Sequence, residues 1–240
     1  MSCQECGGTG LIMKGKVAVR CNCIKKRERK HAYEQSGLTP LMREFTFNEF
    51  DLKYYSEEKT DPVKGMSLAQ TAHITLQAAK EFVQKFIKNR QTEGLLFTGP
   101  VGSGKTYLAC AIANEILNGG GQVMFVVVPD LLDKIRSTYD SQRSELTEQN
   151  IIEAAREVPL LILDDLGVHN YTQWTKNKLY SIINYRLNYQ LPTIITTNLS
   201  VAELSDHLGE RTASRLFQMC KFYRLLVDNN IRYVKRIESK

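Results

Sequence analysis

One segment, Gly99-Pro-Val-Gly-Ser-Gly-Lys-Thr106, matches the pattern G-x-x-x-x-G-K-[ST] at every fixed position. An apolar run, Gly94–Thr98, precedes this segment, and a stretch with helical spacing, Lys105–Leu117, follows it. In such a strand–loop–helix setting, glycines let backbone N–H groups surround phosphate oxygens, and the helix N-terminus adds its positive end. The segment therefore predicts a nucleotide phosphate site, in which Lys105 reaches the β- and γ-phosphates and the Thr106 hydroxyl ligates Mg²⁺.

Two further predicted strands end in polar residues that suit the same site. The apolar run Leu160–Asp164 is followed by Asp165. We expect Asp164 to hold Mg²⁺ and Asp165 to orient or deprotonate the attacking water. The run Thr193–Thr197 is followed by Asn198, which would lie near the γ-phosphate if this strand sits between the other two. Ordinary polar turns at the strand ends are the alternative.

The sequence after residue 66 alternates between strand and helix patterns. Strands are expected at Gly94–Thr98, Gln122–Val128, Leu160–Asp164, Thr193–Thr197 and Phe222–Val227. Helical spacing covers Ser67–Arg90, Lys105–Leu117, Pro129–Thr138, Asn150–Glu157, Gln173–Tyr189, Val201–Leu208 and Arg211–Met219. The polar stretch Tyr139–Gln149 is expected to be mobile. This alternation predicts an α/β fold with a parallel sheet that is covered on both faces.

Four cysteines crowd into the first 23 residues, as Cys3-x-x-Cys6 and Cys21-x-Cys23. Four thiolates from two short turns can close a tetrahedral zinc site, which would be structural because no position is left for water. So small a head has too little core to fold alone, which favours a metal. Four free cysteines are the alternative.

The net charge of +6 lies entirely in residues 1–33, which carry eight basic and two acidic side chains. Much of this charge falls on a predicted basic helix, Ile24–Ser36, which can bind nucleic acid or an acidic protein partner, or be a solvated face. We expect a cysteine-rich head over residues 1–36, a linker over 37–66 and a nucleotide-binding domain over 67–240.

Several classes of protein are excluded by composition. The longest apolar runs are the length of a strand, which is too short for a membrane span. The N-terminus has no apolar region typical of a secretory signal. A cysteine cluster without an export signal indicates a reducing compartment, so we expect a cytoplasmic protein with no membrane partner.

The order of these motifs resembles a known family. Together with Asp164-Asp-Leu-Gly167 and Gly209-Glu-Arg-Thr-Ala-Ser-Arg215, it is similar to the AAA+ ATPases of the bacterial helicase-loader type (DnaC and DnaI) and the related IstB transposition helper. The resemblance covers about residues 40–232. It implies a P-loop AAA+ core with a five-stranded parallel sheet in the order 5-1-4-3-2.

The same resemblance implies roles for particular residues. Asn198 would be the first sensor, and Arg215 or Arg211 an arginine finger that enters the neighbouring subunit's site. Arg232 falls where the family's second sensor arginine would be. Only 13 residues follow Val227, so we expect the helical lid of many AAA+ proteins to be absent or vestigial.

The candidate site residues fall into three sets. Those expected to bind ATP are Gly99, Pro100, Val101, Gly102, Ser103, Gly104, Lys105, Thr106, Tyr107 and Arg232. Those expected to act in hydrolysis are Lys105, Asp164, Asp165, Asn198, Arg215 and Arg211. Metal ligands are expected at Cys3, Cys6, Cys21 and Cys23 for Zn²⁺, and at Thr106 and Asp164 for Mg²⁺.

The leading hypothesis from the sequence is an ATPase that loads a hexameric replicative helicase onto single-stranded DNA. The head would contact the helicase, and the chain would associate with itself into a ring or spiral. Three alternatives remain: an IstB-like regulator of DNA transposition, a P-loop kinase of a small metabolite, and a zinc-dependent DNA-binding module whose ATP site is structural.

Overall fold

The computed structural model describes residues 3–138, 147–167 and 171–238. Its centre is a parallel sheet of five strands, namely β3 (Gly94–Thr98), β4 (Val123–Val127), β5 (Leu160–Asp164), β6 (Thr193–Thr197) and β7 (Cys220–Arg224). The strands stand in the order β4-β5-β6-β3-β7. Numbered 1 to 5 along the chain, they read 5-1-4-3-2 from the β7 edge. The predicted α/β fold is thus confirmed.

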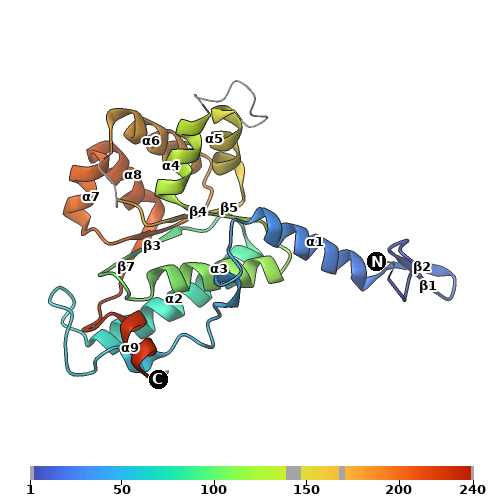
Figure 1. Cartoon of the computed structure of the whole chain (residues 1–240), viewed down its shortest axis with the longest axis horizontal. Helices are drawn as coiled ribbons and strands as arrows, with labels where there is room; N and C mark the ends of the chain where they lie inside the picture. The colour runs from blue at the N-terminus through green and yellow to red at the C-terminus, as the bar shows by residue number, and fades with distance from the viewer. Residues whose placement is uncertain (1–2, 139–146, 168–170, 239–240) are drawn as a thin grey trace.

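Helices cover both faces of this sheet (Figure 1). One face carries α2 (Leu68–Lys88) and α3 (Lys105–Asn118). The other carries α4 (Val128–Ser137), α5 (Glu148–Glu157), α6 (Gln173–Asn188), α7 (Val201–Leu208) and α8 (Glu210–Met219). Each face has its own apolar cluster, as a sheet buried on both sides requires. We expected the polar stretch 139–149 to be mobile. Residues 139–146 of this stretch lie outside the described residues.

The segment over residues 37–66 is not the linker that we expected. Its apolar side chains join the core on the α2 and α3 side, and those buried there are Leu38, Phe47, Phe50 and Tyr55. Two short 3-10 turns, η1 (Met42–Glu44) and η2 (Leu52–Tyr54), shape its path. The side-chain amide of Asn114 in α3 donates to Met42 O at 2.9 Å and to Phe45 O at 2.8 Å. The segment is therefore a strap that packs on α3.

The head extends away from the body (Figure 1). It contains an antiparallel hairpin, β1 (Leu11–Lys14) and β2 (Val17–Arg20), followed by α1 (Asn22–Gln35), which buries none of its residues. Where α1 ends, Phe125 N in β4 donates to Ser36 O at 2.7 Å. Gly37 has φ +80°, and a Cβ there would lie 2.3 Å from Phe125 O. The close approach of this backbone to the sheet edge therefore requires glycine.

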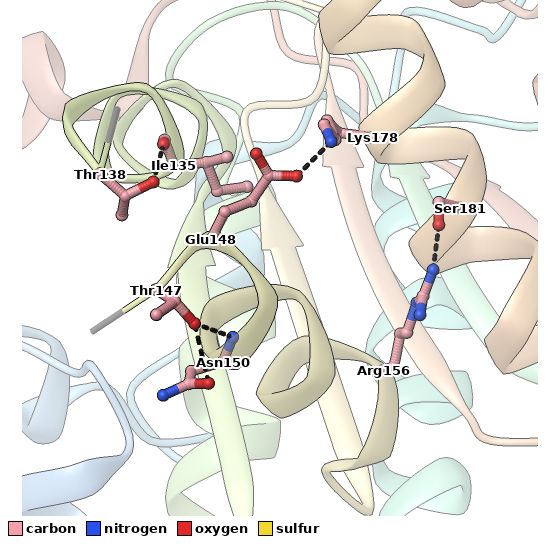
Figure 2. A network of polar contacts seen from close by, with 8 residues as sticks. All are labelled: Ile135, Thr138, Thr147, Glu148, Asn150, Arg156, Lys178 and Ser181. Atoms are coloured by element: carbon pink, nitrogen blue, oxygen red, sulfur yellow. Dashed lines mark hydrogen bonds and ion pairs between the residues drawn. The ribbon is translucent and has the colours of Figure 1, made fainter. Parts of the chain in front are cut away.

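Polar contacts hold α5 against α6 (Figure 2). Thr147 caps α5 by accepting a hydrogen bond from Asn150 N at 3.2 Å. Lys178 pairs with Glu148, and Arg156 donates to Ser181 Oγ. Because α5 leads directly into β5, these contacts help to position the strand that ends in the predicted aspartates.

One further helix, α9 (Ile231–Glu238), follows β7 and was not expected from the sequence. Its first residue, Ile231, donates through its backbone N–H to Gly102 O at 3.1 Å. At its other end, Glu238 accepts from Tyr54 at 2.7 Å and pairs with Lys53 at 3.2 Å. Where we expected the helical lid to be absent or vestigial, the described residues after β7 form one helix of eight residues. Within the described ranges, no helix combines the length and apolar character needed to cross a membrane.

Candidate nucleotide and metal sites

The phosphate loop, Gly99–Thr106, connects the carboxyl end of β3 to α3. Two of its glycines have a left-handed backbone, with φ +76° at Gly102 and +93° at Gly104. A Cβ at Gly99 would lie 1.9 Å from the backbone oxygen of Leu225. The loop can therefore keep this path only with glycine, and its N–H groups stand at the start of a helix, where anions are bound.

Lys105 is 4% exposed and lies folded into the phosphate loop. Its ammonium donates to Gly99 O and Pro100 O, both at 2.8 Å. Burial lowers the pKa of Lys105 to about 8, against the opposing effect of Asp165 and Asp164. The cation is thus held in the loop by backbone carbonyls, and phosphate oxygens are the stronger acceptors that can replace them.

Asp164 and Thr106, the two predicted magnesium ligands, are in contact. Thr106 Oγ1 donates to Asp164 Oδ1 at 2.9 Å. The same carboxylate oxygen accepts from Thr196 Oγ1 at 2.6 Å. Burial raises the pKa of Asp164, and the Thr196 hydrogen bond opposes this rise. A carboxylate beside a hydroxyl oxygen suits Mg²⁺, which binds oxygen ligands.

Asp165 and Asn198 lie at the same edge of the sheet as the phosphate loop. Asp165 has φ +55°, a left-handed backbone that is uncommon outside glycine, and its N–H donates to Thr196 Oγ1 at 3.0 Å. β6 lies between β3 and β5, which is the strand position that we expected to bring Asn198 near the γ-phosphate. Asn198 is exposed. Thr196 was not selected from the sequence, because a threonine within an apolar strand is also an ordinary strand former.

The two arginines of α8 are not brought to the phosphate loop of their own chain. Arg215 donates to Asn184 Oδ1 at 2.6 Å and to the Tyr180 hydroxyl at 3.1 Å, both on α6. It lines a cavity of about 580 Å³ together with residues just before β3, β6 and β7. That is the amino edge of the sheet, opposite the phosphate loop. Arg211 is exposed, and among the described residues neither arginine has a hydrogen bond or ion pair with Gly99–Thr106.

Residues from the strap and from α9 flank the phosphate loop. Tyr55, which the sequence reasoning missed, is buried and donates from its hydroxyl to Ser103 O at 2.8 Å. The ring of Tyr107 stacks on Phe45 with centroids 4.5 Å apart. Arg232 in α9 is exposed, and its charge contributes to lowering the pKa of Lys105 after the larger effect of burial. The strap and α9 therefore both lie against the phosphate loop.

The four cysteines of the head come together as predicted. Their sulfur atoms all lie within 4.8 Å of one another. Cys3 Sγ is 3.7 Å from Cys21 Sγ, and Cys6 Sγ is 3.4 Å from Cys23 Sγ. Tetrahedral zinc with Zn–S bonds of about 2.3 Å requires sulfurs about 3.8 Å apart. The donor set and its spacing therefore fit a structural zinc ion, with the hairpin and the start of α1 around it.

A family model described as IstB-like ATP binding protein matches residues 25–220. The chain belongs to this family. Replicative helicase loader DnaC of Escherichia coli (strain K12) is 25% identical over 207 residues, which are 85% of this chain and 77% of that protein. Replicative helicase loader DnaI of Bacillus subtilis (strain 168) is 27% identical over 186 residues, covering 77% of this chain and 56% of that protein.

A solved structure is similar as well. The crystal structure of the DnaC helicase loader matches with a TM-score of 0.58 and 26% identity, covering 76% of this chain and 98% of that chain. The resemblance to the AAA+ helicase-loader group, drawn from the motifs, is therefore confirmed, and ATP binding comes with the family. The family match begins at residue 25, so the cysteine cluster lies outside it.

Proposed function

We propose that this IstB-family chain is an ATP-dependent loader that binds a hexameric replicative DNA helicase and places it on single-stranded DNA at replication initiation. The observation that carries the proposal is the complete phosphate site, with Lys105 in the loop and Asp164 bonded to Thr106, in a chain similar to DnaC over 85% of its length. We place this activity in the cytoplasm. The similarity to loaders favours it over the metabolite kinase.

In this proposal the phosphate loop binds the triphosphate of ATP through its N–H groups. The ammonium of Lys105 leaves the carbonyls of Gly99 and Pro100 for the β- and γ-phosphates. Thr106 and Asp164 would hold Mg²⁺, which neutralises phosphate charge when bound. Asp165 orients or deprotonates the attacking water, and the products are ADP and phosphate.

Two features favour an assembly of subunits. Asn198 lies at the phosphate edge, where it can contact the γ-phosphate, whereas Arg215 lies at the opposite edge. An arginine held there, or Arg211 on the same helix, is suited to stabilise the transition state in a neighbouring subunit. Arg232 would sense the nucleotide from α9. We therefore propose a ring or spiral in which ATP controls association and DNA binding.

We propose that residues 1–36 form a zinc-binding head that contacts the helicase. The head extends from the body, and α1 buries none of its residues, so its basic side chains are accessible to a partner (Figure 1). We propose further that residues 67–240 form the ATPase domain. The strap over 37–66 packs on this domain and belongs with it structurally.

The decisive experiment mixes the purified full-length chain with a purified hexameric replicative helicase and closed circular single-stranded DNA, in ATP or in ADP. We expect helicase to be retained on the DNA only when the loader and ATP are present. Lys105→Ala should abolish this loading, whereas Lys85→Ala, on the exposed face of α2, should leave it unchanged. Failure of the chain to bind any replicative helicase in either nucleotide would refute the proposal.

The family match also favours a second candidate, an IstB-like ATPase that regulates DNA transposition. Such a protein would form ATP-dependent filaments on DNA without a helicase. The same purified chain can be tested for this by electron microscopy with double-stranded DNA in ATP. Filaments that form while no helicase is bound would favour the transposition role.

A further inference from the structure

The Thr196 side chain, near the carboxyl end of the central strand β6, makes two hydrogen bonds that no motif assigns. Its hydroxyl oxygen is 2.6 Å from Asp164 Oδ1 and 3.0 Å from the backbone nitrogen of Asp165. The residue is completely buried. A single hydroxyl group therefore contacts both of the consecutive aspartates to which we assign magnesium binding and water activation.

The direction of these hydrogen bonds is fixed by their chemistry. A backbone N–H can only donate, so Thr196 Oγ1 must accept the bond from Asp165. The one hydroxyl proton is then directed to the carboxylate of Asp164, and a short bond to an ionised acceptor is among the stronger kinds. Because Thr196 is shielded from solvent, exchange of this bond for one to bulk water is disfavoured.

The contacts of Thr196 also fix the backbone just after β5. Asp165 adopts φ +55°, which is uncommon for a residue other than glycine, and its N–H is held by the Thr196 hydroxyl. The next N–H, that of Leu166, donates to the Thr196 carbonyl at 2.9 Å. Two successive peptide groups are therefore bound to one residue of the neighbouring strand, which determines where the Asp165 side chain starts.

We propose that Thr196 is a positioning residue that sets the conformation of both aspartates for magnesium binding and for ATP hydrolysis. Thr106 donates to the same oxygen of Asp164, so this carboxylate is held between α3 and the central strand β6. Thr106 has a direct role at the metal, whereas Thr196 acts only through the aspartates. This inference rests on the proposed ATPase function.

The test compares Thr196→Val, which keeps the β-branched shape and removes the hydroxyl, with Thr196→Ser, which keeps the hydroxyl. Thr75→Val is the matched control, because Thr75 is also completely buried and its hydroxyl donates to Thr71 O at 2.8 Å within α2. For each full-length protein we would measure ATP affinity with Mg²⁺ and with EDTA, and kcat and KM for ATP hydrolysis.

For Thr196→Val we expect a fall of about 10- to 100-fold in kcat, the size typical of losing one hydrogen bond to a charged group. The gain in ATP affinity that Mg²⁺ provides should shrink, while affinity in EDTA stays within about twofold of the original protein, since phosphate contacts are retained. Thr196→Ser should restore most of both losses, and Thr75→Val should match the original protein.

The proposal is overturned if Thr196→Val keeps kcat and the magnesium-dependent ATP affinity within about twofold of the original protein. The Thr196 hydroxyl would then contribute nothing to hydrolysis or to magnesium binding. Equal losses in Thr196→Ser and Thr196→Val would also overturn it, because packing rather than the hydroxyl would be responsible. If the original protein binds no helicase and hydrolyses no ATP, the loader function fails, and the magnesium-dependent affinity still decides the role of Thr196.

Discussion

Replacing Arg186 by methionine should strongly destabilise the fold, because this side chain joins α6, α5 and β6 at the amino edge of the sheet. Arg186 lies in α6 and is completely buried. Its guanidinium donates to five acceptors at 2.7–3.1 Å, with the two protons of Nη1 shared among the carbonyls of Ala155, Arg156 and Val158, Nη2 donating to Pro192 O, and Nε donating to Thr193 Oγ1. Burial lowers its pKa to about 9, which leaves it protonated at neutral pH. It therefore ties the end of α5 to the start of β6.

The expected fall in the free energy of unfolding follows from the number of hydrogen bonds that the substitution removes. A hydrogen bond contributes about 1 kcal/mol net, so the four N–H groups engaged give about 4 kcal/mol, partly offset because a buried charge is removed. We expect the free energy of unfolding of Arg186→Met to fall by about 2–4 kcal/mol and Tm by roughly 4–16 °C for a chain of this size.

Urea unfolding followed by circular dichroism measures this change. Arg136→Met serves as the control, because Arg136 is exposed in α4 and, among the described residues, its side chain has one ion pair, with Asp133 at 4.0 Å. It should change the free energy of unfolding by less than about 0.5 kcal/mol. A loss below about 1 kcal/mol for Arg186→Met would show that the carbonyls find other partners, and the reasoning would be wrong.

Three further predictions concern the proposed sites. Metal analysis should find about one zinc per chain, and Cys21→Ser should lose the metal while ATP affinity is unchanged, since the cysteine cluster lies outside the nucleotide site; less than about half an equivalent in the original protein would refute the zinc site. Tyr55→Phe removes the hydrogen bond to Ser103 O and should weaken ATP binding, measured by calorimetry, by about 5- to 10-fold. An unchanged ATP affinity would contradict a role of the strap in nucleotide binding. Either Arg211→Ala or Arg215→Ala should lower ATP turnover of the assembled protein by about 10³-fold without changing the ATP affinity of isolated subunits; an equal loss of affinity would contradict action on a neighbour.

The sequence was sufficient to predict the parts of the site that follow from local pattern. The phosphate loop is defined by eight consecutive residues, and the strands around it are continuous apolar runs. Because parallel strands end at one edge, the polar residues after them meet there, as Asp164 and Thr106 do. The cysteine cluster could also be predicted from the sequence, because the spacing of the four cysteines brings their sulfurs within reach of one ion.

Other parts depend on contacts between residues far apart in the chain. The aromatic residues of 37–66 have neither a period of 2 nor of 3.6, so their burial against α3 could not be distinguished from a loop. Thr196 has the composition of a strand residue, and its role depends on the register with β5. The acceptors of Arg186 come from α5 and from the start of β6, so no local pattern marks it.

Arg186 and Thr196 join β5 and β6 at opposite edges of the sheet. At the amino edge, Arg186 binds the carbonyls before β5 and before β6. At the carboxyl edge, Thr196 binds Asp164, the last residue of β5, and Asp165, the residue that follows it. The helix that carries Arg186, α6, also holds Arg215 through Asn184 and Tyr180. The arginine that we propose acts on the neighbouring subunit is therefore attached to the helix whose Arg186 fixes the amino ends of β5 and β6.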